Sequence, residues 1–334
     1  MLTEKENYLM ALAGKIPEWV PRNLVASPGH APASVAVTPG FLNARRVNGA
    51  GFDIWGVEYV TTKETGYQAL PKPGQFIMDD ITKWRDIIKV PDISDIDWES
   101  MAKKDMEKID RSQTAVRMKV HLGYFQQLMN FMGFTEGLCA MLEEPDEVME
   151  LFEYMNKFYM EVSAKAMEYY KPDVWCITDD TATATNPFIS VEMYREMVKP
   201  FHTREASFAK NIGMPIDMHD CGRCEDFIED WLDFGVTCWN PAQVMNDLKG
   251  IKEKYGNRLV LEGCWDSQGP VGWPDATEEM IREQVRQCID TFAPGGGFVF
   301  WGSLYGAPDD EEFLKRSRWI TEEYDAYGRT FYQK

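Results

Sequence analysis

A short stretch in the second half of the chain concentrates side chains that could do chemistry. From Pro215 to Cys224 the sequence reads Pro-Ile-Asp-Met-His-Asp-Cys-Gly-Arg-Cys, and an acidic pattern with helical spacing follows it. The apolar segment ends abruptly at His219, which predicts that His219, Cys221 and Cys224 lie at the carboxyl end of a strand. α/β proteins place their chemistry at this end of the strands. Because histidine and cysteine are ligands that suit zinc, the stretch indicates a metal or substrate site.

Other predicted strands end in side chains of the same kinds. Asp179 and Asp180 follow one apolar segment, and Cys264 follows a later one. In a barrel of parallel strands these ends converge on one mouth. We therefore expect Cys264 to join His219 and the two nearby cysteines, and we expect Asp179, Asp180 or His219 to act as the acid. Further strand-end candidates, which we assign to substrate binding, are His121, Trp239, Asn240, Trp265 and Trp301.

Several of these residues also have structural explanations. His121 is equally typical of a hydrogen-bonded core histidine, and adjacent aspartates such as Asp179 and Asp180 can cap a following helix. The pattern Cys221-Gly-Arg-Cys224 at a predicted helix start also has the form of a disulfide oxidoreductase motif. A thioredoxin-like domain is far smaller than this chain, however, and would need its own strand-helix-strand context. The remaining cysteines lie in apolar segments and are expected to be buried core thiols: Cys139, Cys176, Cys238 and Cys288.

The composition excludes several classes of protein. The chain has 334 residues, 44% of them hydrophobic, and a formal net charge of -19. This charge would repel phosphate backbones, and no basic stripe interleaved with aromatic residues is visible, so we expect no nucleic-acid partner. No window approaches the roughly 18 apolar residues of a membrane span, and residues 1–13 lack the pattern of a signal peptide. Seven cysteines without a secretion pattern indicate reduced thiols and a cytoplasmic location.

The order of predicted elements indicates the fold class. Extended segments are expected over residues 20–26 and 52–61. From Val116 onward, short apolar segments alternate with helical patterns, of which 144–170 is the longest and 190–212 is another. Repeated units of this length are typical of a parallel sheet. Seven strands are visible and an eighth is expected in the first third of the chain, which favours a (β/α)8 barrel over an open doubly wound sheet. We expect one domain over residues 1–334, with residues 27–110 forming an elaborated region that covers one end of the barrel.

Several motifs resemble those of the uroporphyrinogen decarboxylase family. The stretch Val-Arg-Met-Lys-Val-His-Leu-Gly-Tyr-Phe-Gln-Gln-Leu-Met-Asn-Phe-Met-Gly at 116–133 carries the resemblance, together with segments 173–180, 189–194 and 199–201 and with His219-x-Cys221-Gly222. The resemblance implies a (β/α)8 barrel. The family contains decarboxylases and corrinoid-protein methyltransferases. Decarboxylases of this kind hold the acidic side chains of a tetrapyrrole with arginines, and the corresponding stretch 21–31 offers only Arg22. The methyltransferase branch is therefore the better match.

The resemblance also implies a set of zinc ligands. Zinc enzymes of this branch use His-x-Cys, which His219 and Cys221 match, plus a cysteine near the last strand, where this chain has Ser303. An acidic residue and two cysteines are the proposed ligands in the enzymes that act on aromatic methyl ethers. Glu196, Cys224 and Cys264 resemble that arrangement, as does the stretch 263–270. The implied ligands are therefore drawn from Cys264, Cys224, Cys221, His219 and Glu196.

The function that the resemblance implies is methyl transfer. The methyl group of a veratrol- or guaiacol-type ether would move to the cob(I)alamin of a partner corrinoid protein, with zinc assisting the departure of the phenolate. The tryptophans expected to enclose the aromatic ring are Trp239, Trp265, Trp301 and Trp55. One alternative is a decarboxylase without a cofactor, with Asp179 and His219 as its polar pair. Another is a non-catalytic protein that binds a methyl carrier or stores zinc. We also consider a homodimer.

Overall fold

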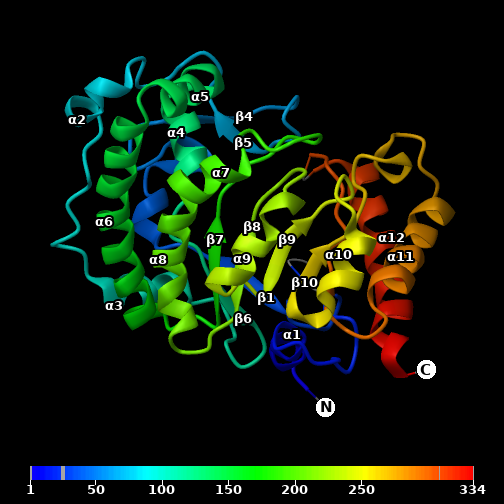
Figure 1. Ribbon diagram of the computed structural model, residues 1–334. Coiled ribbons are helices and arrows are strands. Elements are labelled where there is room, and N and C mark those ends of the chain that lie inside the picture. The colour runs from blue at the N-terminus through cyan, green and yellow to red at the C-terminus, as the bar shows by residue number, and fades with distance from the viewer. Residues whose placement is uncertain (1, 24–26, 308, 334) are drawn as a thin grey trace.

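A sheet of seven parallel strands forms the centre of the protein (Figure 1). The computed structural model describes residues 2–23, 27–307 and 309–333. Neighbouring strands follow one another along the chain, as expected when each strand is joined to the next by a helical crossover. In order across the sheet, the strands are β1 (Ser34–Val37), β6 (Ala115–Met118), β7 (Val174–Thr178), β8 (Ile216–His219), β9 (Cys238–Ala242), β10 (Val260–Gly263) and β11 (Phe298–Phe300).

An eighth extended segment, residues 21–23, fills the place between β11 and β1. Arg22 forms a parallel bridge with Phe300, whose N–H donates to the carbonyl of Pro21 at 2.8 Å. On the other side, the hydroxyl of Ser34 donates to the side chain of Asn23. These contacts, with the seven-stranded sheet, confirm the (β/α)8 barrel. The last three residues of the expected first strand, Val20–Ala26, lie outside the described residues.

Helices surround the sheet on its outer side (Figure 1). The expected helix over 144–170 is confirmed as α6, because its apolar residues recur at spacings of three and four and are buried. The expected single helix over 190–212 is instead divided by a π-helical turn, and its second part begins at Lys199-Pro200. The helices are α1 (Glu4–Leu12), α2 (Trp84–Ile87), α3 (Trp98–Asp105), α4 (Tyr124–Met132), α5 (Phe134–Glu143), α6 (Pro145–Tyr170), α7 (Val191–Met193), α8 (Lys199–Lys210), α9 (Ile228–Phe234), α10 (Leu248–Tyr255), α11 (Glu278–Phe292) and α12 (Glu311–Tyr327).

Shorter helical turns join these elements. The π-helical turn is η3 (Tyr194–Val198), and the 3-10 turns are η1 (Gly40–Asn43), η2 (Ile81–Lys83), η4 (Glu225–Phe227), η5 (Gly256–Arg258), η6 (Pro270–Gly272) and η7 (Gly328–Gln333). Among the described helices, none is long and apolar enough to cross a membrane.

A second, antiparallel sheet lies near α4 and α5 in Figure 1 and consists of β2 (Arg46–Val47), β3 (Ala50–Phe52), β4 (Glu58–Thr61) and β5 (Ala69–Pro71). The expectation of one strand over 52–61 is wrong, because a tight turn separates β3 from β4. The Asp53 carboxylate accepts hydrogen bonds from the N–H groups of Trp55 and Val57 at 2.9 and 2.8 Å, and Gly56 has a φ of 96°. Side-chain capping of this kind competes with a continuous strand. The boundaries of a single domain over 1–334 stay a prediction.

Three charged residues and one amide fill the lower part of the barrel interior and form what we call the floor cluster: Asn23, Arg117, Asp217 and Glu262. Arg117 donates to Glu262 at 2.9 Å and to Asp217, and Asn23 also donates to Glu262. Arg117 is only 5% exposed and both acids are fully buried. Helix α1 lies below the strands, and the hydroxyl of its Tyr8 reaches Glu262 at 3.4 Å. The barrel is therefore closed at this end by paired charges.

Candidate active site at the barrel mouth

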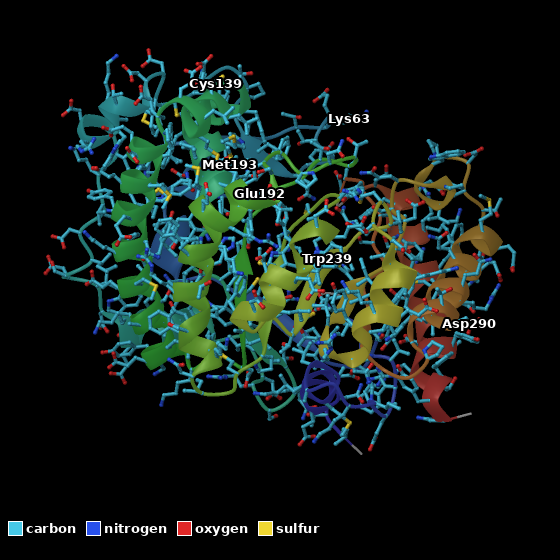
Figure 2. The ribbon with its side chains drawn as sticks, in the orientation of Figure 1. Lys63, Cys139, Glu192, Met193, Trp239 and Asp290 are labelled. Atoms are coloured by element: carbon cyan, nitrogen blue, oxygen red, sulfur yellow. The ribbon has the colours of Figure 1, made fainter. Side chains whose placement is uncertain are left out.

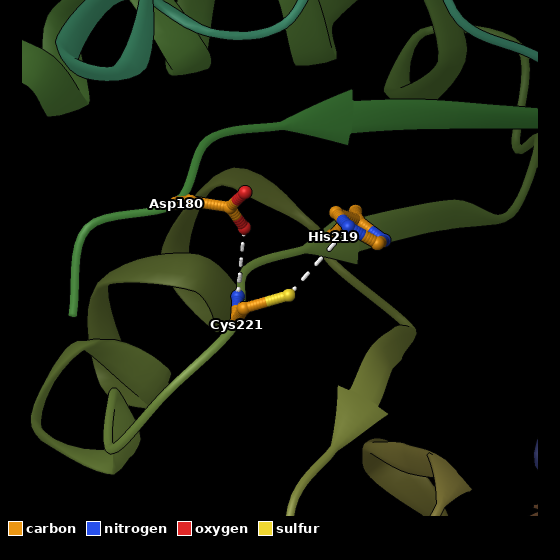
Figure 3. A group of neighbouring side chains, drawn as sticks. All are labelled: Asp180, His219 and Cys221. Carbon is orange, nitrogen blue, oxygen red and sulfur yellow. Dashed lines mark hydrogen bonds between the residues drawn. The ribbon is translucent and has the colours of Figure 1, made fainter. Parts of the chain in front are cut away.

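Three side chains from two neighbouring strands meet at the carboxyl ends of the strands (Figure 3). His219 ends β8, Cys221 follows it, and Asp180 follows β7. The Cys221 N–H donates to the Asp180 carboxylate at 3.0 Å, and the Cys221 sulfur lies 3.8 Å from His219 Nε2. One ligand atom from each residue lies within 4.8 Å of the other two. We call this group the mouth triad, and within the described part of the chain it is the one such group of metal-ligand side chains.

Strand geometry explains why these residues face one another. Thr178 on β7 is paired with His219 on β8. Because side chains alternate along a strand, the residues two places further on, Asp180 and Cys221, continue on the same side. Gly222 has a φ of 97°, and a Cβ there would lie 2.5 Å from the carbonyl oxygen of Ala182. Glycine therefore allows the loops after β7 and β8 to approach closely enough to form the triad.

The hydrogen bonds around His219 indicate its tautomer. His219 Nδ1 lies 2.7 Å from the side-chain oxygen of Asn240. The amide nitrogen of Asn240 donates to the carboxylate of Asp217, so its oxygen is the atom that faces His219. An oxygen can only accept, and Nδ1 must therefore carry the proton. Burial, together with the charge of Lys119, also lowers the pKa of His219. The ring is thus neutral, with the lone pair of Nε2 directed at Cys221, and it is a better ligand than acid.

The mouth triad fits a zinc ion by the chemistry of its donors. It offers one imidazole nitrogen, one sulfur and one carboxylate oxygen, the ligand types found in zinc sites. Asn240 accepts a hydrogen bond from the other ring nitrogen of His219, as outer partners of metal-bound histidines do. Burial and the neighbouring Asp180 raise the pKa of the Cys221 thiol well above its usual value. A metal bound here would therefore displace the thiol proton.

The carboxylate of Asp179 has different hydrogen-bond partners from that of its neighbour Asp180. Its fully buried carboxylate accepts hydrogen bonds from the first N–H groups of α4, those of Tyr124 and Phe125 at 3.1 Å and of Gln126 at 2.8 Å. His202 on α8 also lies 3.2 Å from it. Asp179 thus caps α4, a helix that precedes it in the chain, and not the following helix that we considered for this pair. Its catalytic role stays a prediction.

The other predicted metal ligands lie outside the mouth triad. The Cys224 thiol is buried and donates to the carbonyls of Asp220 and Gly222, at 3.4 and 3.6 Å. Cys264 has a positive φ of 56°, and its carbonyl accepts the thiol of Cys288 on α11 at 3.4 Å. Glu196 is exposed on the π-helical turn. A ligand role for these three residues stays a prediction. Of the four expected core thiols, Cys139 is exposed on α5, which corrects that expectation.

A cavity of about 450 Å³ adjoins the mouth triad, and we call it the mouth cavity. Its polar lining includes the ionisable side chains of Lys119, Asp180, His219 and Tyr59, and the neutral ones of Gln126, Asn130 and Thr178. Its apolar part comes from the second sheet and from helices α4 and α5, and includes Leu70, Met129 and Phe134. A smaller side cavity, of about 230 Å³, shares Lys119 and is lined also by Arg46, Trp55, His121 and Tyr159.

The predicted substrate-binding residues are dispersed. Trp55 and His121 line the side cavity, where the indole of Trp55 donates to the Tyr159 hydroxyl at 3.0 Å. Trp239 is fully buried within the body of the molecule (Figure 2), and its indole donates to the Asp220 carbonyl at 3.0 Å. Trp265 is buried and donates to the Ser303 carbonyl, while Trp301 is partly buried. Substrate contact by these residues stays a prediction.

Apart from Asp180 and His219, the residues that line the mouth cavity were not predicted, above all Lys119 and Phe134. Alternation along one strand could have identified Lys119, because Arg117, Lys119 and His121 are two residues apart. No comparable pattern marks Phe134, which reaches the cavity from a helix. His219 and Cys221 were predicted as ligands, whereas Asp180 was predicted as an acid.

Comparisons with known proteins place the chain in a family. Residues 124–302, just over half of the chain, match the model of the family described as uroporphyrinogen decarboxylase (URO-D). A methylated-thiol–coenzyme M methyltransferase of Methanosarcina mazei is 29% identical over 107 residues, which span 32% of this chain but only 27% of that protein. A solved structure described as a methyltransferase from Methanosarcina mazei has a TM-score of 0.64 at 17% identity, covers 98% of this chain and 99% of its own, and shows the same fold. By its match over residues 124–302, the chain belongs to the uroporphyrinogen decarboxylase family.

Proposed function

We propose that the protein is a methyltransferase that moves the methyl group of a small aromatic methyl ether to the corrinoid of a partner protein. The observation that carries this proposal is the mouth triad of Asp180, His219 and Cys221 at the edge of a largely apolar cavity. A cavity of about 450 Å³ lies within the range of pockets that enclose small organic ligands.

The residues around the cavity have distinct roles in this proposal. Asp180, His219 and Cys221 would hold a zinc ion, and Asn240 would keep the imidazole in the required tautomer. When bound there, zinc would supply Lewis acidity toward the ether oxygen. Phe134 and Met129 offer an apolar surface against which an aromatic ring can pack.

The charges around the cavity argue against a tetrapyrrole substrate. Among the described lining residues of the mouth cavity, Lys119 is the sole cation. Arg22, the candidate from the sequence, is buried against α12, where it donates to Thr321 at 3.0 Å. A porphyrinogen with many carboxylates would need several fixed cations in the cavity itself. A methyl group as the transferred unit agrees with the two similar proteins of Methanosarcina mazei, both of which are named as methyltransferases.

Mixing the purified protein with a reduced corrinoid protein and guaiacol or veratrol tests the proposal. We expect the cob(I)alamin spectrum to change to that of methylcobalamin and the demethylated phenol to appear, and neither should occur without this chain. Release of carbon dioxide from uroporphyrinogen, without methyl transfer from any ether, would replace the proposal by the decarboxylase alternative. Zinc measured by elemental analysis without either activity would instead favour a binding or storage protein.

A further inference from the structure

Lys119 is a cation placed at the reacting end of the mouth cavity. It follows β6, and its backbone N–H donates to the carbonyl of Val37 at 3.0 Å, which fixes the base of the side chain. Arg117, two residues earlier on the same face, is bound by two carboxylates. The half-buried Lys119 lines the mouth cavity and the side cavity, yet within the described residues its ammonium makes no hydrogen bond or ion pair. A cation without a protein partner is thus directed at the space that a ligand would fill.

The other groups near the mouth triad are poorly suited to donate a proton there. His219 directs its Nδ1 N–H at the Asn240 oxygen and its Nε2 at Cys221. Asp179 is engaged by the N–H groups of α4 and by His202. Asp180 accepts from the Cys221 N–H, and as a carboxylate beside the leaving oxygen it would oppose the charge that develops. In the side cavity, Arg46 donates to the Gly49 carbonyl and lies over the Tyr59 ring.

We propose that Lys119 is the general acid of the reaction, donating its proton to the phenolate oxygen as the methyl group leaves. This inference rests on the proposed function. The bond between the methyl carbon and the ether oxygen breaks, and its electron pair stays on oxygen. The reduced cobalt of the partner's corrinoid supplies the pair that forms the new bond to carbon. The oxygen takes the proton from Lys119 Nζ, and the neutral amine regains a proton from water.

The chemistry predicts a dependence on the leaving group. A general acid matters most when the departing oxygen is strongly basic, and it contributes typically about 10²–10⁴-fold. Guaiacol leaves as a basic phenolate, whereas a nitro-substituted methoxybenzene leaves as a weakly basic one. Removal of the Lys119 amine should therefore slow demethylation of guaiacol far more than that of the nitro compound, and the loss should fall on kcat rather than on KM.

The test compares Lys119→Met, Lys119→Arg and Lys63→Met with the unchanged protein on a series of methoxybenzenes of graded leaving-group basicity. Lys63 is an exposed lysine beyond β4 (Figure 2) and serves as the matched control. We expect Lys119→Met to lower kcat for guaiacol by about 100-fold or more and for the nitro compound by less than about tenfold. Lys119→Arg keeps the charge but is a very weak acid, so an intermediate loss is expected. Lys63→Met should match the unchanged protein.

Zinc content and the circular dichroism spectrum of Lys119→Met should equal those of the unchanged protein, which separates loss of the acid from loss of the metal or fold. An equal loss for every leaving group, or a loss confined to KM, would overturn the acid role while leaving the methyltransferase proposal intact. Absence of methyl transfer from all ethers in the unchanged protein would overturn both proposals.

Discussion

The floor cluster and the mouth triad occupy the same barrel interior but differ in how their polar atoms are used. In the floor cluster, Arg117 is bound by two fully buried carboxylates, those of Asp217 and Glu262. In the mouth triad, whose His219 lies two residues beyond Asp217 on β8, His219 Nε2 and the Cys221 sulfur face one another at 3.8 Å. The paired opposite charges of the floor cluster stabilise the barrel. The ligand atoms of the mouth triad, which face one another, can bind a metal.

Asn240 connects the two regions. Its amide nitrogen donates to Asp217 of the floor cluster, and its oxygen accepts from His219 of the mouth triad. The floor cluster thereby sets, through Asn240, the tautomer of His219 in the mouth triad. A charge-paired layer thus orients the ligand layer above it, as outer partners do in metal sites.

The largest effect should come from breaking the floor cluster. Arg117→Met leaves Asp217 and Glu262 buried without their cation, and loss of one partner of a buried ion pair costs about 3–5 kcal/mol. We expect the free energy of unfolding in urea to fall by that amount. His219→Ala is the matched change in the mouth triad and should cost only about 1 kcal/mol, for one lost hydrogen bond. Equal losses in the free energy of unfolding for Arg117→Met and His219→Ala would contradict the proposed difference between the floor cluster and the mouth triad.

The mouth triad should instead control zinc. Cys221→Ala should weaken zinc binding by at least about 100-fold, above the range typical of outer partners, whereas Cys224→Ala should bind zinc as the unchanged protein does. The reason is that Cys224 donates its thiol to two carbonyls and lies outside the triad. Titration with a zinc indicator measures both affinities.

The acidity of Cys221 sharpens this test. Because burial raises the pKa of its thiol, zinc must displace a proton, and the apparent affinity of the unchanged protein should fall as the pH falls. Retention of zinc by Cys221→Ala together with its loss from Cys224→Ala would favour the ligand set implied by the sequence resemblance.

The smallest effect should come from the residue that connects the two regions. Asn240→Ala removes the group that orients His219 but leaves every ligand of the mouth triad in place. We expect zinc affinity to fall by about 10–100-fold. The Asp217→Asn variant keeps a side chain of the same shape. It tests whether the floor cluster determines the orientation of the Asn240 side-chain amide. Unchanged zinc affinity in Asn240→Ala would mean that the imidazole is oriented by packing alone.

Much of the fold could be predicted from periodicity. The strand Ile216–His219 and the helix Pro145–Tyr170 were located because buried apolar runs and spacings of three and four are local properties of the sequence. The strand expected over 52–61 was wrong, because the Asp53 side chain turns the chain by hydrogen bonds that apolar periodicity does not register. The division of the helix over 190–212 by a π-helical turn was also missed.

The sequence by itself determined the family, the alternation of strands with helices and the presence of His219 and Cys221 at a strand end. These features depend on residue types and on spacing within one segment. Only the tertiary structure decided which residues join them. Asp179 and Asp180 are adjacent in the chain, yet one caps α4 and the other faces His219 and Cys221. Cys264 lies outside that group and has a positive φ, which its residue type does not predict. Backbone direction at each strand end, set by pairing with neighbouring strands, determines which side chains share the mouth.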